Sequence, residues 1–141
     1  MKITGINHVG IAAKDPKKAS WFFREILKLP FQGEELVVDQ KTNTIMFDSG
    51  VGLLSPGRLE ILENQEGQEG PIAKYLEKKG GGIHHVALNV DDVLAAIAEL
   101  QSHNIQMIDT APRKGAHNTL IAFVHPRSTG GILVELVEES K

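Results

Sequence analysis

The sequence contains no cysteine and few aromatic side chains. The lack of cysteine in its 141 residues excludes disulfide bonds, thiolate metal sites and thiol nucleophiles. One Trp, one Tyr and five Phe are present, and 15 Lys and Arg are outnumbered by 18 Asp and Glu, which gives a net charge of −3. Proteins that bind nucleic acid usually present a basic surface and aromatic side chains for stacking. We therefore expect no nucleic-acid partner.

Long hydrophobic runs are also absent. No uncharged apolar run approaches the roughly 20 residues that span a bilayer, and no basic-then-apolar leader opens the chain. A composition of 41% hydrophobic and 23% charged residues is typical of a soluble globular domain. The sequence thus favours a single cytoplasmic domain over residues 1–141 with no membrane partner. Six histidines are the one count that stands out.

Hydrophobic periodicity predicts an α+β fold. Period-two and β-branched segments predict strands, and apolar residues at helical spacing predict helices. Asp15 and Pro16 suit the start of the first helix, and Gly80 suits the end of the second. The expected strands are 2–13, 35–39, 43–48, 51–54, 58–63, 82–90, 105–109, 119–125 and 132–138, and the expected helices are 16–28, 71–79 and a stripe over 93–100.

The pattern occurs twice along the chain. Residues 6–11 (INHVGI) align with residues 83–88 (IHHVAL), which places His8 over His85. An aspartate that suits a helix N-cap follows each histidine by seven residues, at Asp15 and Asp92. The sequence therefore predicts two related β-α-β-β-β halves.

Each half also carries one acidic residue inside an apolar strand. Glu60 follows His8 by 52 residues, and Glu135 follows His85 by 50 residues. Taken singly, each histidine has a simpler interpretation as a hydrogen-bonded core residue, and each glutamate as an exposed one. Four such residues at equivalent positions of two halves favour a shared metal site, because a buried carboxylate is costly without a compensating cation.

The donor set indicates which metals would suit the site. Two imidazoles and two carboxylates fit a borderline divalent ion such as Zn²⁺, Co²⁺, Ni²⁺, Mn²⁺ or Fe²⁺. Four protein ligands leave two positions of an octahedral ion open for water or substrate oxygens, which favours chelation of a substrate over a purely structural site. Neighbouring strand residues face opposite ways, so only one of His84 and His85 can bind the metal. The repeat aligns His85 with His8 and His84 with Asn7, so His85 is preferred. His103 is interpreted as a solvated helix end and His125 as structural.

Several runs resemble one family. Two β-α-β-β-β halves with a His/Glu site resemble the vicinal oxygen chelate superfamily, which includes glyoxalase I, extradiol dioxygenases and bleomycin-resistance proteins. Within it, the sequence is similar to the methylmalonyl-CoA epimerases. The runs that carry this similarity are 6–12, 70–78, 82–87, 90–92, 113–117, 125–131 and 134–136.

The resemblance implies an architecture. Two tandem βαβββ modules would form a curved mixed sheet around the metal site. Module one would span about 1–66, a linker helix about 70–80, and module two about 81–141. A homodimer is the usual assembly in this superfamily.

The resemblance also implies an activity. It points to interconversion of the two epimers of methylmalonyl-CoA by 1,1-proton transfer through a metal-stabilised enolate. His8, Glu60, His85 and Glu135 would bind the metal, with Co²⁺ or Zn²⁺ expected and Mn²⁺ or Ni²⁺ as alternatives. Glu135 would also act as one acid/base group. The substrate would be an acyl-CoA thioester.

The second acid/base group departs from the family pattern. Inversion requires one proton donor or acceptor on each face of the enolate, and Thr44 stands where the family has a carboxylate. Asp48, interpreted as a turn residue, lies about 13 Å further along an extended strand. Either Glu60 serves the second face, or the substrate differs.

The resemblance implies that two loops carry the substrate contacts. Arg113, His117, Arg127 and Ser128, together with Lys114, would receive the substrate carboxylate or the CoA phosphates. The alternative interpretation is that these residues are ordinary charges on surface hairpins.

Other functions remain open at this point. A glyoxalase I-like lactoylglutathione lyase would use the same fold and similar ligands. A non-catalytic binding protein of the glyoxalase/bleomycin-resistance type would lack bound metal. An extradiol dioxygenase is disfavoured, because that class uses two histidines and one carboxylate and normally has a longer chain.

Overall fold

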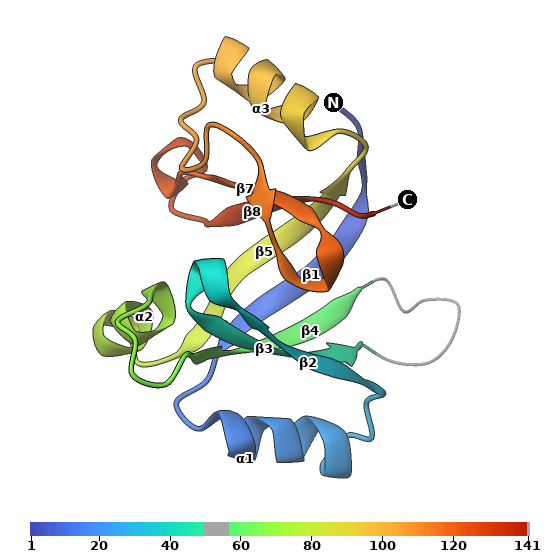
Figure 1. The fold of residues 1–141 in the computed structure, drawn as a ribbon, viewed down its shortest axis with the longest axis vertical. Helices are drawn as coiled ribbons and strands as arrows, with labels where there is room; N and C mark the ends of the chain where they lie inside the picture. Colours follow the sequence, from blue (N-terminus) through green and yellow to red (C-terminus); the bar gives the residue numbers. More distant parts are fainter. Residues whose placement is uncertain (50–56, 141) are drawn as a thin grey trace. The chain divides into compact units, whose positions relative to one another are not determined.

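The computed structural model of the chain describes residues 1–49 and 57–140. The chain divides into two compact units, one formed by His8–His84 and the other by Met1–Asn7 together with His85–Lys141. The strand predicted at 51–54 lies outside the described residues. The other elements confirm an α+β fold with mixed sheets (Figure 1).

The His8–His84 unit contains a four-stranded mixed sheet in the order β2-β3-β4-β1. β1 pairs with β4 in parallel, and the other two pairs are antiparallel. The elements with residues in this unit are β1 (Ile3–Ala12), α1 (Pro16–Trp21), the π-helical turn η1 (Phe22–Ile26), β2 (Phe31–Val37), the 3-10 turn η2 (Val38–Gln40), β3 (Thr42–Asp48), β4 (Arg58–Asn64), α2 (Pro71–Lys79) and the start of β5 (Gly82–Val90).

The second unit has the same strand pattern. Its sheet follows the order β1-β5-β8-β7-β6, in which β5 and β8 are parallel while β8, β7 and β6 are antiparallel neighbours. Its further elements are α3 (Val93–Ser102), β6 (Arg113–Lys114), the 3-10 turn η3 (Ala116–Asn118), β7 (Leu120–Val124), the 3-10 turn η4 (Pro126–Ser128) and β8 (Val134–Glu138).

The first helix begins as predicted and ends differently. The Asp15 side chain accepts a hydrogen bond from the Lys18 backbone N–H, at 3.1 Å. After Trp21 the helix widens, and the Leu27 N–H donates to the Phe22 carbonyl oxygen, at 2.9 Å. The α-helix predicted over 16–28 therefore changes to a π-helical turn after Trp21.

The helix and the turn pack on the sheet through two half-buried side chains. Ala19 and Phe23 pack against a core cluster on β3 and β4 formed by Ile45, Phe47 and Ile61. Three other apolar side chains of the predicted helix 16–28, Phe22, Ile26 and Leu27, are exposed.

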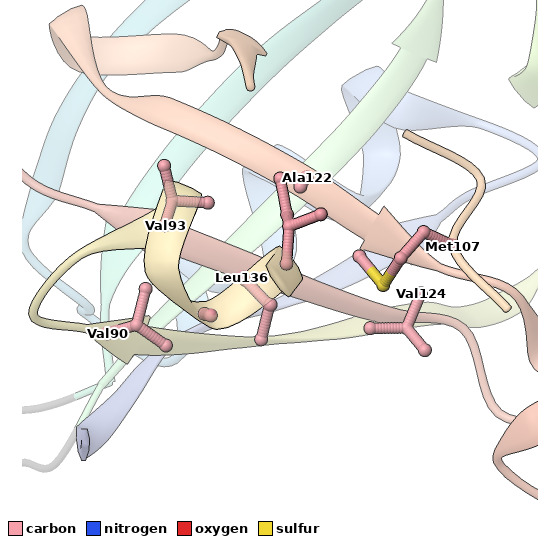
Figure 2. Packing of buried hydrophobic residues seen from close by; sticks show 8 residues of the cluster. Val90, Val93, Met107, Ala122, Val124 and Leu136 are labelled. Atoms are coloured by element: carbon pink, nitrogen blue, oxygen red, sulfur yellow. The ribbon is translucent and has the colours of Figure 1, made fainter. Parts of the chain in front are cut away.

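α3 covers one face of the second sheet. The Asp92 side chain caps the helix by accepting from the Ala95 N–H, at 2.9 Å. The helix side chains Val93, Ala96 and Ile97 pack on strand residues that share one face of β7 and β8. Figure 2 shows this core, whose strand members include Ala122, Val124 and Leu136.

Side-chain alternation leaves the opposite sheet faces for other residues. On β8, Leu136 lies under α3, so Glu135 and Val137 face the other way. In the His8–His84 unit, Ile61 of β4 lies under α1, so Glu60 and Leu62 face away from that helix. In both units the predicted acidic residue is thus turned away from the helix-covered face.

Three expectations need correction. Residues 105–109 do not form a strand, because the described ladder there is a single bridge between Met107 and Val124. Arg113 and Lys114, expected in a loop, form the short strand β6. Asp48 is the last residue of β3, opposite Arg58, and is not a turn residue.

Among residues 1–49 and 57–140, the structure contains no helix with the length and apolar character needed to span a membrane.

Candidate metal centre and active site

A buried imidazole–carboxylate pair lies on β1 and β4 of the His8–His84 unit. His8 Nε2 lies 3.5 Å from Glu60 Oε1. The two residues are 5% and 4% exposed, respectively. The parallel register pairs Glu60 with Gly10, two residues after His8 on the same side of β1. Gly10 has no side chain, so β1 places nothing bulkier than hydrogen beside the glutamate.

A second buried pair lies on β5 and β8 of the other unit. His85 Nε2 lies 3.0 Å from Glu135 Oε2. Each residue is 5% exposed. The register pairs Glu135 with Ala87, again two residues after the histidine.

The two units therefore repeat the same construction. In each, a histidine on one strand meets a glutamate on the parallel neighbour, and the register offset is identical. This agreement confirms the repeat that the sequence predicted. Burying a carboxylate beside an imidazole is expensive unless a proton, a cation or several hydrogen bonds compensate the charge.

Three of these side chains form a candidate metal-binding group. His8, Glu60 and His85 are buried, and one ligand atom from each lies within 4.8 Å of the others. Two imidazole nitrogens and a carboxylate oxygen are donors that divalent first-row metals accept. The residues present therefore fit a divalent metal ion.

The His85–Glu135 pair is held by a contact that the sequence analysis missed. The Phe123 ring packs edge-to-face with the His85 imidazole, with centroids 5.7 Å apart. Phe123 is also the direct cross-strand neighbour of Glu135. One aromatic side chain on β7 thus borders both members of the pair.

Phe123 is in turn held by Asp109 and Arg113. Asp109 Oδ2 accepts a hydrogen bond from the Phe123 backbone N–H, at 2.8 Å. Asp109 Oδ1 lies 3.1 Å from Arg113 Nε, and Arg113 Cζ lies 5.6 Å from the Phe123 ring centroid, over the ring. No periodicity signals this arrangement, because Asp109 and Phe123 meet through the fold of an irregular segment.

Thr44 lies on the same face of its sheet as Glu60. It is 3% exposed, and its hydroxyl donates to the Glu35 carbonyl oxygen, at 2.9 Å. A threonine hydroxyl is not a general base at neutral pH. The structure thus identifies a hydrogen-bonding role for Thr44 between β3 and β2.

The remaining histidines lie where the sequence indicated. His84 is half-buried and packs edge-to-face on Tyr75, with centroids 4.9 Å apart. His103 is exposed at the C-terminal end of α3. His125 Nδ1 accepts from the Arg127 N–H, at 3.0 Å, and so caps the turn η4.

Arg113 and Ser128, both predicted to bind substrate, contact other residues of the same unit. Arg113 is engaged by Asp109 as described, and Ser128 Oγ accepts a hydrogen bond from the Gln106 N–H, at 2.9 Å. His117 is exposed and adopts a left-handed conformation, with φ of 57°, in η3. Arg127 is exposed on η4.

Comparison with known proteins identifies relatives over nearly the whole chain. Residues 7–123 match the family model of the Glyoxalase/Bleomycin resistance protein/Dioxygenase superfamily. The uncharacterized protein YqjC of Bacillus subtilis (strain 168) is 38% identical over 133 residues, which cover 94% of this chain and 91% of that protein. The mitochondrial methylmalonyl-CoA epimerase of Mus musculus is 34% identical over 144 residues, covering 96% of this chain and 73% of that protein.

Solved structures agree with this grouping. A variant of the Streptomyces coelicolor methylmalonyl-CoA epimerase in complex with 2-nitronate-propionyl-CoA has a TM-score of 0.90 and 28% identity. The similarity covers 99% of this chain and 100% of that one. With a paired His/Glu site on this scaffold, the chain belongs to the Glyoxalase/Bleomycin resistance protein/Dioxygenase superfamily, as an enzyme of its methylmalonyl-CoA epimerase-like branch.

Proposed function

We propose that this enzyme interconverts the two epimers of methylmalonyl-CoA by moving one proton off and onto the carbon between the thioester and the carboxylate. The observation that carries the proposal is the pair of buried His–Glu sets at identical register in the two units. The relatives named as epimerases support the choice of substrate.

His8, Glu60, His85 and Glu135 are the proposed ligands of a divalent metal, with Co²⁺ or Zn²⁺ expected and Mn²⁺ or Ni²⁺ as alternatives. When bound, such an ion would act as a Lewis acid toward the charge that develops on the substrate oxygens. The protein holds the four proposed ligands in buried, fixed positions, so their side chains do not have to reorient as the reaction occurs.

Glu135 is the proposed acid/base group for one face of the substrate. Its carboxylate takes the α-proton as the C–H bond breaks, and the electron pair moves into the thioester carbonyl to form an enolate. Return of a proton to the other face of the planar carbon inverts the centre. Glu60, the equivalent carboxylate of the other unit, is the sequence-based candidate for that second step.

The proposed substrate contacts are Arg113, His117, Arg127 and Ser128. The geometry of Arg113 supports its part, because Asp109 and the Phe123 ring hold the guanidinium in one orientation next to the His85–Glu135 pair. A pre-oriented guanidinium suits recognition of a carboxylate or phosphate. A homodimer and a cytoplasmic location remain predictions, and the named mouse relative is a mitochondrial protein.

A second candidate function is supported by the presence of one buried glutamate in each unit. A glyoxalase I-like lactoylglutathione lyase would need a carboxylate from each half, and Glu60 and Glu135 meet that requirement. Its substrate would be a glutathione hemithioacetal.

A direct test compares the two substrates. Purified protein loaded with Co²⁺ is given single-epimer methylmalonyl-CoA in D₂O, and separately a hemithioacetal of glutathione. The proposal expects formation of the other epimer and incorporation of solvent deuterium at the α-carbon, with no thioester formed from the hemithioacetal. Thioester formation without epimerisation would favour the lyase.

A further inference from the structure

The proposed reaction needs a second proton donor on the face opposite Glu135. Glu60 is poorly suited to that task, because it is one of the three members of the candidate metal-binding group and lies against His8. Glu60 and Glu135 are both proposed metal ligands, and Glu135 already serves one face of the substrate. A carboxylate that binds a cation is a weaker base than one that does not. Another carboxylate on the same sheet face of the His8–His84 unit would be better suited to the second step.

The strand register brings Glu35 of β2 onto this face. Glu35 lies directly opposite Thr44 of β3, and Thr44 lies opposite Leu62 of β4. Directly opposed residues of antiparallel strands share a face. Leu62 and Glu60 are two residues apart on β4 and also share a face. Glu35 therefore projects from the edge strand on the same side of the sheet as Glu60.

On β2 a glutamate is more buried than the neighbouring leucine, which is the reverse of the pattern that an edge strand favours. Leu36 is 42% exposed, and Glu34 is exposed as well. Glu35, between them, is half-buried. A strand that leaves a leucine in solvent and turns a glutamate inward gives up apolar burial and desolvates a charge. Features of this kind, where local preference is overridden, are concentrated at functional sites.

The second unit shows independently how far a side chain at the position of Glu35 can extend. In the second unit, Arg113 of β6 lies opposite Ile121 of β7, and Ile121 lies opposite Val137 of β8. Val137 is two residues after Glu135, as Leu62 is two residues after Glu60. Arg113 therefore occupies in its unit the position that Glu35 occupies in the other.

Arg113 shows the reach available from that position. Its guanidinium extends over the ring of Phe123, which is the cross-strand neighbour of Glu135. A long side chain on the edge strand thus extends inward across the adjacent strand. At the position equivalent to Phe123, the other unit has Met46, the cross-strand neighbour of Glu60.

Thr44 supports Glu35 from the neighbouring strand. Its hydroxyl donates to the Glu35 carbonyl oxygen, which fixes the backbone from which the carboxylate projects. Thr44 is also smaller than a glutamate. The side chain of β3 directly opposite Glu35 therefore leaves room for the Glu35 side chain to extend across β3.

We infer that Glu35 is a further catalytic residue of the proposed epimerase, where it donates and accepts the proton on the substrate face opposite Glu135. The inference rests on the proposed function. In one direction Glu135 takes the α-proton, and the O–H bond of protonated Glu35 then breaks as a C–H bond forms on the other face. In the reverse direction the two carboxyl groups exchange roles. Between turnovers each carboxyl group exchanges its proton with solvent, which restores the starting protonation states without net consumption of a reactant.

Stereospecific deuterium exchange tests this role. Glu35→Gln keeps the size of the side chain and removes its ability to carry the proton. Co²⁺-loaded variant and wild type are each incubated in D₂O with one epimer of methylmalonyl-CoA at a time, and the uncatalysed exchange is subtracted. We expect epimerisation to fall about 100-fold or more. One epimer should still exchange its α-proton with retention of configuration, because Glu135 can remove and return it alone.

Glu34→Gln is the matched control. Glu34 is the adjacent residue on the opposite face of β2, where its Oε1 accepts from Asn43 Nδ2, at 2.6 Å. The substitution makes the same chemical change one residue away, and both reactions should proceed as in wild type. Metal content and melting temperature are measured for all three proteins.

The outcomes separate this inference from the proposed function. If Glu35→Gln epimerises at a near wild-type rate, Glu35 is not the second group. The same conclusion follows if it loses exchange with both epimers equally, or loses its metal. A wild-type protein that neither exchanges nor epimerises methylmalonyl-CoA overturns the proposed function, and the role of Glu35 with it.

Discussion

At the scale of single residues, the site depends on carboxylates placed where solvent cannot reach them. Glu60 and Glu135 are each paired with an imidazole on a parallel neighbour, in a register that both units share. Neither glutamate is stabilised by the apolar strand around it, so each depends on charged or hydrogen-bonding partners. Replacing one partner should therefore lower turnover and metal content by more than the loss of folding stability explains.

Glu135→Ala removes the proposed proton carrier and one proposed metal ligand. We expect turnover to be lost and metal retention to be weakened, because His85 keeps its place but loses its carboxylate partner. Epimerisation assays and elemental analysis of the purified variant measure the two effects. Turnover near the wild-type rate would show that Glu135 has neither role.

Asp109 offers a second test at this scale. Asp109→Ala leaves the Phe123 N–H without its acceptor, which should cost about 1–3 kcal/mol of the free energy of unfolding. It also releases Arg113 and the ring beside His85, so metal content should fall. Asp109→Asn keeps an acceptor for the Phe123 N–H, so it should lose less folding stability and less metal than Asp109→Ala. Urea unfolding and elemental analysis measure these changes.

Asp92→Ala is the control for Asp109. It removes the N-cap of α3 in the same unit, at a similar cost of about 1 kcal/mol, without touching the His85–Glu135 pair. Metal content should therefore remain at the wild-type level. If Asp92→Ala loses metal as readily as Asp109→Ala, the effect is one of general stability, and Asp109 does not position the site.

At the scale of elements, strand β1 is tied to the turn between β5 and α3. The Lys2 N–H donates to Asp91 Oδ1, at 3.2 Å, and the Asp91 N–H donates to the Lys2 carbonyl oxygen, at 3.3 Å. These reciprocal bonds anchor the first strand of the unit that contains His85. The hydrogen bond from Lys2 also holds the pKa of the Asp91 carboxyl below its ordinary value of 3.8.

The lowered pKa of Asp91 predicts a pH dependence. A carboxyl whose pKa is lower in the folded state stabilises the fold above pH 3.8, and this stabilisation disappears as the pH falls through the folded pKa. Asp91→Asn should therefore be less stable than wild type at pH 6, and the difference should shrink toward zero in strong acid. Thermal melts of both proteins across this range measure it. A difference that stays constant with pH would contradict the assignment.

At the scale of the whole molecule, metal binding should be linked to folding. A ligand that binds only the native state at 100 times its Kd stabilises it by about 2.7 kcal/mol. We expect Co²⁺ to raise the melting temperature and EDTA to reverse the rise, because the binding free energy of a native-state ligand adds to the folding free energy. Melting curves with Co²⁺ and with EDTA measure the shift.

His85→Ala is the control for the metal effect. It removes one member of the candidate metal-binding group, so the shift caused by Co²⁺ should be much smaller in this variant. An equal shift in His85→Ala and wild type would place the stabilising metal elsewhere.

Most of the architecture could be predicted from the sequence, because the responsible signals are local. The aspartate caps at Asp15 and Asp92 start helices at the expected residues. The recurrence of His8 at His85, with a glutamate about fifty residues after each, predicted the repeat and the residues that carry it. The choice of His85 over His84 followed from the alignment of His8 with His85, and in the structure His85 is buried while His84 is half-buried.

The errors occurred where backbone geometry departs from a regular period. The helix predicted over 16–28 changes to a π-helical turn after Trp21, and the segment 105–109 carries apolar residues but forms a single bridge in place of a strand. Strand β6 at Arg113 is only two residues long, too short for any period to indicate it.

The sequence alone determined the helix starts and the recurrence of a histidine and a glutamate in each half, because cap, period and repeat can be read along the chain. The tertiary structure alone decided which distant side chains meet. It set Asp109 beside Phe123, and it set Glu35 across from Thr44 on the face that Glu60 occupies. Register is fixed by hydrogen bonds between strands that are far apart in the chain, and no local pattern specifies it.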